Sequence, residues 1–109
     1  SPEFQAAVHL RTAVQILGQD EGESATTEAL NEAYRHLILA LDIYPDDKWA
    51  HEQLENVTWK LTRRNQKPPP DLKRKADFLA AKYQEIKAGR KSVLVVGARD
   101  RWDVDAVVA

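Results

Sequence analysis

Residues 26–45 carry a wide apolar pattern with helical spacing. Apolar side chains recur there at steps of three and four residues, which places them on one face of an α-helix. A second stripe runs beside the first, and the two cover more than the roughly 100° that a surface helix needs. The first stripe is Leu30, Ala33, Leu37, Ala40 and Tyr44, and the second is Tyr34, Ile38 and Leu41. The sequence therefore predicts a core helix contacted by neighbours on two sides.

The ends of this helix are also visible in the sequence. Thr26 or Thr27 can cap its N-terminus, and Pro45 ends it. Leu39 does not fit, because it falls among charged residues on the polar face. We expect another part of the same chain to cover Leu39, and a contact with a partner is the alternative.

Three further helices are predicted around the central one. They cover residues 5–18, 48–64 and 71–88, each with an apolar stripe on one face. Gly18 ends the first helix and Gly89 is expected to cap the last one. Acidic residues 19–25, the turn at 45–47 and the proline-rich segment 65–70 connect the helices. The pattern predicts an all-α fold, a four-helix antiparallel array over residues 5–89.

The tail, residues 90–109, changes period. A β-branched run is followed by a turn and by alternating apolar and acidic positions, which predicts a short β-prone segment or hairpin. Because an isolated two-stranded ribbon is marginal in water, we expect the tail to dock on the helices or to pair with a second molecule as a homodimer. The residues expected to pair or dock are Val93, Leu94, Val95, Val96, Trp102 and Val104.

Length and composition limit the class of protein. A chain of 109 residues is one domain by size, and it has no cysteine for disulfides or thiolate metal sites. No apolar run approaches the ~18 residues that span a bilayer, and no signal peptide is visible, so we expect a cytoplasmic protein. Residues 1–4 resemble a remnant of a cloning vector, and we base nothing native on them.

The net charge of −1 hides a strong asymmetry. Residues 1–58 hold eleven acidic and three basic side chains, whereas residues 59–91 hold three acidic and eleven basic ones. Acidic helices that pack on basic helices would explain this. Alternatively, the basic half forms a patch for an acidic partner, which is a protein, a nucleic acid or an anionic membrane. The patch would contain Lys60, Arg63, Arg64, Lys67, Lys73, Arg74 and Lys75.

Two tryptophans lie outside the apolar stripe of the third predicted helix. Trp59 shares its face with Glu52, Glu55 and Arg63, so it either packs against the tail or is available to a partner. Trp49 presents the same two alternatives. The candidate partner-binding residues are therefore Leu39, Trp49, Trp59, Lys60, Arg63, Arg64, Lys73, Arg74 and Lys75.

No pattern of catalytic, metal-binding or cofactor-binding residues is convincing. The run at 91–98 has the strand and first glycine of a dinucleotide site, but it lacks the further glycines and the helix that hold a pyrophosphate. His9, His36 and His51 fall on three different predicted helices. Caps and solvated faces explain the acidic residues. We expect a protein that is not an enzyme and that binds no metal or cofactor.

Residues 29–61 resemble the tetratricopeptide repeat over about one and a half repeats. Ala33, Leu37, Ala40 and Pro45 match the spacing of small and large residues and the closing proline of that repeat. Trp49, Ala50 and Leu54 fall where the next repeat would begin. The resemblance implies a stacked helical hairpin that binds peptides or protein surfaces.

A second set of motifs resembles a J-domain. The matching residues are Ile16-Leu17-Gly18, Ala33-Tyr34-Arg35, Leu39 and Tyr44-Pro45-Asp46, with Tyr44 where that family has its diagnostic histidine. In J-domains the histidine loop and a basic second helix engage the seventy-kilodalton heat-shock chaperone. The resemblance implies a co-chaperone domain without chaperone-stimulating activity, because the histidine is absent.

These observations give three ordered expectations for function. The first is a non-catalytic protein–protein interaction module, an adaptor or scaffold, that binds a protein or peptide of acidic character. The second is a nucleic-acid-binding domain that uses the basic residues 60–91, with an affinity that falls steeply with salt. The third is the J-like domain.

Overall fold

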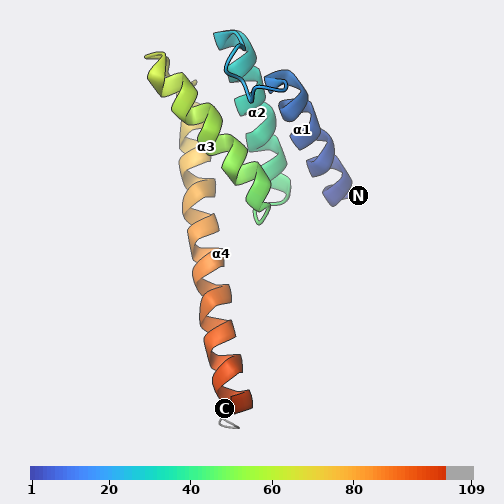
Figure 1. Cartoon of the computed structure of the whole chain (residues 1–109), viewed down its shortest axis with the longest axis vertical. Helices are drawn as coiled ribbons and strands as arrows, with labels where there is room; N and C mark the ends of the chain where they lie inside the picture. The colour runs from blue at the N-terminus through green and yellow to red at the C-terminus, as the bar shows by residue number, and fades with distance from the viewer. Residues whose placement is uncertain (103–109) are drawn as a thin grey trace.

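The chain forms four α-helices that pack antiparallel, as the sequence predicts (Figure 1). A computed structural model describes the backbone of residues 1–102 and the side chains of residues 1–90. The helices are α1 (Pro2–Leu17), α2 (Thr27–Ile43), α3 (Lys48–Arg63) and α4 (Pro70–Trp102). The all-α prediction is confirmed for this part of the chain.

Helix α2 is the centre of the fold. It contacts α1, α3 and α4, and both of its predicted apolar stripes are buried except for Tyr44, which follows the helix and is 45 % exposed. Seven of its side chains are removed from water, namely Leu30, Ala33, Tyr34, Leu37, Ile38, Ala40 and Leu41. The predicted core helix with neighbours on more than one side is therefore confirmed.

The helix ends follow the capping residues of the sequence. Thr26 Oγ1 accepts a hydrogen bond from the Ala29 backbone N–H at 3.0 Å, and Asp47 Oδ1 accepts one from Ala50 at 3.1 Å. Helix α1 begins at Pro2 rather than near residue 5, because Ser1 caps it and proline suits the first helical turn.

The acidic loop between α1 and α2 is held by the basic end of α3. Asn56 Nδ2 donates to the Glu21 carbonyl at 2.9 Å, and Arg63 pairs with the Glu23 carboxylate at 3.2 Å. Gly22 is buried within this loop with φ +94°, and a Cβ there would lie 2.9 Å from a Leu17 methyl. The two halves of the charge asymmetry thus meet in a contact inside the molecule.

Helix α4 is longer than predicted. It continues for 33 residues, through Gly89 and the β-branched run at 93–96, so the predicted cap at Gly89 and the strand after it are wrong. A helix that already exists gains one hydrogen bond for each residue added, which outweighs the weak strand preference of one turn and the cost of about 1 kcal/mol for an internal glycine. Val104 lies outside the described residues. Tail pairing or docking stays a prediction.

Candidate functional site

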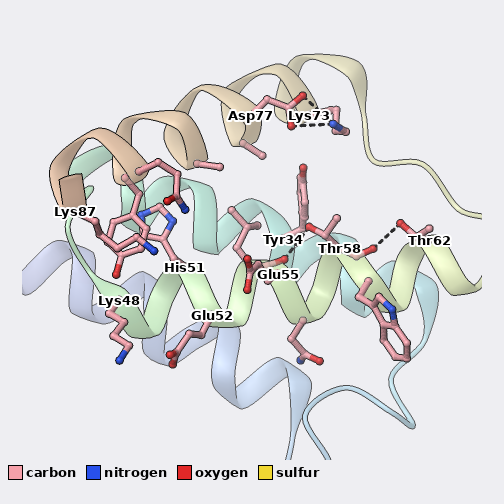
Figure 2. Close-up of a pocket in the computed structure, with 17 residues that line it drawn as sticks. Tyr34, Lys48, His51, Glu52, Glu55, Thr58, Thr62, Lys73, Asp77 and Lys87 are labelled. Atoms are coloured by element: carbon pink, nitrogen blue, oxygen red, sulfur yellow. Dashed lines mark hydrogen bonds and ion pairs between the residues drawn. The ribbon is translucent and has the colours of Figure 1, made fainter.

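A groove runs between α3 and α4, above α2 (Figure 2). Its volume is about 940 Å³. The lining residues recur at steps of three and four along both helices, from Lys48 to Thr62 on α3 and from Lys73 to Lys87 on α4. Each wall is therefore one helix face of about four turns, or about 21 Å.

The floor of the groove carries a buried hydroxyl without a partner. Tyr34 rises from α2 between the two walls, toward the helix that carries Asp77 (Figure 2). Its side chain is 1 % exposed, and its hydroxyl has no hydrogen-bond partner among the described residues. Burial, with a smaller contribution from the Asp77 charge, raises the pKa of Tyr34 to about 12. The hydroxyl thus stays protonated at neutral pH and can donate and accept.

An aromatic stack closes one end of the groove. The rings of His51 and Tyr83 lie 4.0 Å apart between centroids, at 16° to one another. His51 Nε2 lies 2.8 Å from the Pro45 carbonyl, and because a carbonyl only accepts, this nitrogen carries the hydrogen. Lys87 Nζ lies 4.8 Å from the Tyr83 ring centroid. The stack fixes α4 against α3 at this end.

Trp59 stands at the edge of the α3 wall. It is 58 % exposed, and the Arg63 guanidinium lies 4.2 Å from its ring centroid. Trp49 is 52 % exposed and does not line the groove. Leu39 is 37 % exposed and also lies outside the lining, so the expected cover from the same chain is incomplete within the described residues. Of these three candidates, the structure brings only Trp59 to the groove.

The basic residues of α3 point to the acidic loop. Lys60 is 7 % exposed, donates to Asn56 Oδ1 at 2.6 Å and lies 3.9 Å from Glu23. Arg63 pairs with the same glutamate, and Arg64 donates to two loop carbonyls. These three side chains are used within the fold.

The basic residues at the start of α4 also have acidic partners. Lys73 Nζ lies 2.8 Å from Asp77, and Lys75 Nζ lies 2.9 Å from Asp42 of α2. Arg74 pairs with Asp71. Such exposed pairs contribute little stability, but they lower the positive field that the sequence alone suggests. Of the six basic candidates, only Lys73 lines the groove.

A second polar contact joins α1 to α2. The Nδ1 atoms of His9 and His36 lie 3.1 Å apart, and Glu32 lies 3.3 Å from His36 Nε2. The ring centroids are 5.3 Å apart, so the two nitrogens point at one another. If His36 Nε2 carries the hydrogen that faces Glu32, then His9 Nδ1 is the donor and His36 Nδ1 the acceptor. This is a hydrogen bond between helices, because neither nitrogen is aimed at a shared third position where an ion would sit.

Within the part of the chain that the structure describes, no group of three or more metal-ligating side chains gathers. No helix of that part has both the length and the apolar character that crossing a membrane requires. Comparisons with protein-family models, with curated proteins and with solved structures find no match for this chain.

Most of the groove could not be predicted from the sequence. Tyr34 reads as an ordinary core residue, and Asp77 and Ala80 read as a solvated face. One feature was present in the sequence: residues 73, 76, 77, 80 and 84 form a stripe of small and polar residues at helical spacing. Such a stripe beside an apolar one indicates a second contact face of the helix.

Proposed function

We propose that this chain is a non-catalytic protein-binding module that holds one α-helix of a partner protein in the groove between α3 and α4. Two helices stand apart there over a third, which is the place that the next helix of a bundle fills, at interaxial distances of about 8–10 Å. Walls of about 21 Å match a partner helix of roughly fourteen residues.

The Tyr34 hydroxyl is the observation that carries this proposal. A buried polar group without a partner costs about 1–3 kcal/mol, and most buried groups in proteins are paired. A polar side chain of a bound helix would supply the missing partner for Tyr34. Trp59, exposed beside the same groove, is the residue type that anchors interfaces.

A tetratricopeptide-like hairpin is the finer fold that we propose for α2 and α3. Ala33, Leu37 and Ala40 are all buried on α2, and Pro45 follows the helix, which supports the small–large–small logic of that repeat. The J-like alternative has less support. Asp46 Oδ2 of the Tyr44-Pro45-Asp46 turn pairs with Arg90 at 2.8 Å, so one oxygen of that carboxylate is already engaged.

Nucleic-acid binding is the second candidate, and ion pairing weakens it. Five of the six basic candidates have a partner carboxylate within 4.0 Å in the described part of the chain, and Arg64 donates to backbone carbonyls. A phosphate backbone would compete with these pairs. Labelled DNA and RNA, titrated at two salt concentrations, test this candidate directly.

The proposal is tested with a displayed library of eighteen-residue helical peptides randomised on one face. Peptides are selected on the native chain, and their affinities are then measured by fluorescence anisotropy. Ala80 lines the groove, whereas its neighbour Ala81 is exposed and does not. Ala80→Trp fills the groove, and Ala81→Trp is the matched control.

We expect selected peptides to lose at least tenfold in affinity for Ala80→Trp and to bind Ala81→Trp as they bind the native chain. Circular dichroism checks that both variants keep their helices. Selection that yields no helical binders, or binders that ignore Ala80→Trp, would overturn the proposal. Nucleic-acid binding at low salt that both tryptophan variants retain would favour the second candidate.

A further inference from the structure

Charge is ordered along the groove. Lys48 and Lys87 lie at the end closed by the His51 stack, and Lys73 and Asp77 lie at the other end (Figure 2). Glu52 and Glu55 follow Lys48 along the α3 wall, one and two turns further on. The groove therefore has a basic end and an acidic middle.

The charges at the two ends differ in whether they are already paired. Lys73 and Asp77 neutralise one another at 2.8 Å. Lys48, Lys87, Glu52 and Glu55 have no ion-pair partner within residues 1–90. The N-terminus of α3 lies at the Lys48 end, and the Asp47 carboxylate that caps it offsets its positive partial charge. Charges of both signs without an ion-pair partner within residues 1–90 thus line the groove.

We infer that the bound helix runs antiparallel to α3, with its C-terminal end and an acidic residue at Lys48 and Lys87, and with a basic residue facing Glu52 and Glu55. This inference rests on the proposed function and names the chemistry of the partner. The C-terminus of a helix carries about half a negative charge, so this direction places unlike charges together, and the reverse direction places like charges together.

The floor adds one further requirement. The Tyr34 hydroxyl lies near the Asp77 carboxylate, whose charge contributes to the raised pKa of this tyrosine. A second carboxylate would be repelled at this place. The partner therefore meets Tyr34 with a neutral amide or hydroxyl, or with a cation, in the N-terminal half of its helix.

The direction is read from the sequences of selected peptides. The same library is selected on the native chain, on Lys48→Glu with Lys87→Glu, and on Lys67→Glu with Lys82→Glu. The last pair makes the same change of net charge, at exposed lysines that do not line the groove. We expect acidic residues in the last turn of peptides from the native and control selections. Peptides from the native selection should bind the first double variant at least tenfold more weakly.

A second measurement fixes the direction independently. Because the chain has no cysteine, a nitroxide label on a cysteine added to the peptide reacts nowhere else. A label at the peptide C-terminus is expected to broaden the amide resonances of residues 48–52, and a label at its N-terminus those of residues 73–77.

The outcomes separate the two proposals. Suppose that Ala80→Trp blocks the peptides, but the peptides have no acidic last turn or give the opposite broadening pattern. Either result overturns this inference and leaves the proposed function standing. Peptides that both double variants weaken equally overturn it too, since the effect is then one of net charge. The absence of any peptide sensitive to Ala80→Trp overturns both.

Discussion

The contact between α1 and α2 and the space between α3 and α4 differ in how completely they are filled. On the α1 side, Leu10, Ala13 and Leu17 are all buried, and α2 supplies apolar residues in return. On the other side, α3 and α4 present Glu55, Thr58 and Asp77 toward the space between them. The contact between α1 and α2 is a closed core, whereas the space between α3 and α4 is an open groove.

The difference comes from the residue types on the sides that each helix pair turns toward one another. Small and aliphatic side chains at the inward positions of α1 let two helices meet, because burying them costs no hydrogen bond. On α3 and α4 the positions facing α2 are apolar as well, but the sides that these two helices turn toward one another carry charged and hydroxyl side chains, which keep their water. A binding surface is thus built by leaving one helix pair incompletely apolar.

Enlarging an alanine tests the comparison most strongly. Ala13 is 0 % exposed on α1, whereas Ala80 is exposed in the groove. Ala13→Leu is expected to lower the free energy of unfolding by about 3 kcal/mol through overpacking, and Ala80→Leu to change it by less than about 0.5 kcal/mol. Urea denaturation measures both. Equal losses in the two variants would mean that the groove is as closed as the core.

The loop glycines provide the next contrast. Gly22→Ala is expected to cost about 2 kcal/mol, because its φ is +94° and the new Cβ would lie 2.9 Å from Leu17 and 3.1 Å from Leu30. Gly18 has φ +80° with no atom within 4 Å, so Gly18→Ala should cost about 1 kcal/mol from the backbone alone. Thermal unfolding of both variants gives the comparison. A Gly18 variant less stable than the Gly22 variant would contradict the closed core.

Removing the Tyr34 hydroxyl should stabilise the fold, in contrast to the glycine substitutions. Tyr34→Phe deletes a buried group without a partner, so we expect the free energy of unfolding to rise by about 1 kcal/mol while affinity for groove-binding peptides falls. Urea denaturation and anisotropy measure the two effects. A variant that is clearly less stable would show that the hydroxyl is paired in the free protein.

The smallest expected effect is the pH dependence of stability that Glu32 of α2 contributes. The hydrogen bond from Arg35 lowers the pKa of Glu32 below its ordinary value of 4.5, and His36 adds a weaker effect. A lowered folded pKa stabilises the protein above the unfolded value, and the gain is lost as the pH falls through the folded value. The stability difference between the native chain and Glu32→Gln should be present at pH 7 and should shrink as the pH falls below 4.5. A difference that grows in acid would contradict it.

The sequence predicted the closed side well. The stripe from Leu30 to Ala40, the Thr26 cap and the break at Pro45 each appear where periodicity and capping place them. Local chemistry decides these features, so a linear pattern contains them.

The open side could not be predicted in the same way. The position where α4 ends depends on whether residues 93–96 extend an existing helix, and the residue preferences of a single turn do not predict this. The contacts of Lys60 and Arg63 with an acidic loop about forty residues earlier in the chain could not be predicted either, and the basic patch stays a prediction. Such pairings depend on tertiary contacts and leave no periodic trace in the sequence.

The tie between the acidic loop and α3 also bears on the order of folding. Glu21 and Glu23 are held by Asn56 and Arg63, which lie 35 and 40 positions further along the chain. The hairpin of α1 and α2 can form from contacts between residues close in sequence, whereas the contacts of the acidic loop with α3 form only after α3 has docked. Substitutions of Asn56 or Arg63 should therefore speed unfolding and leave the refolding rate almost unchanged.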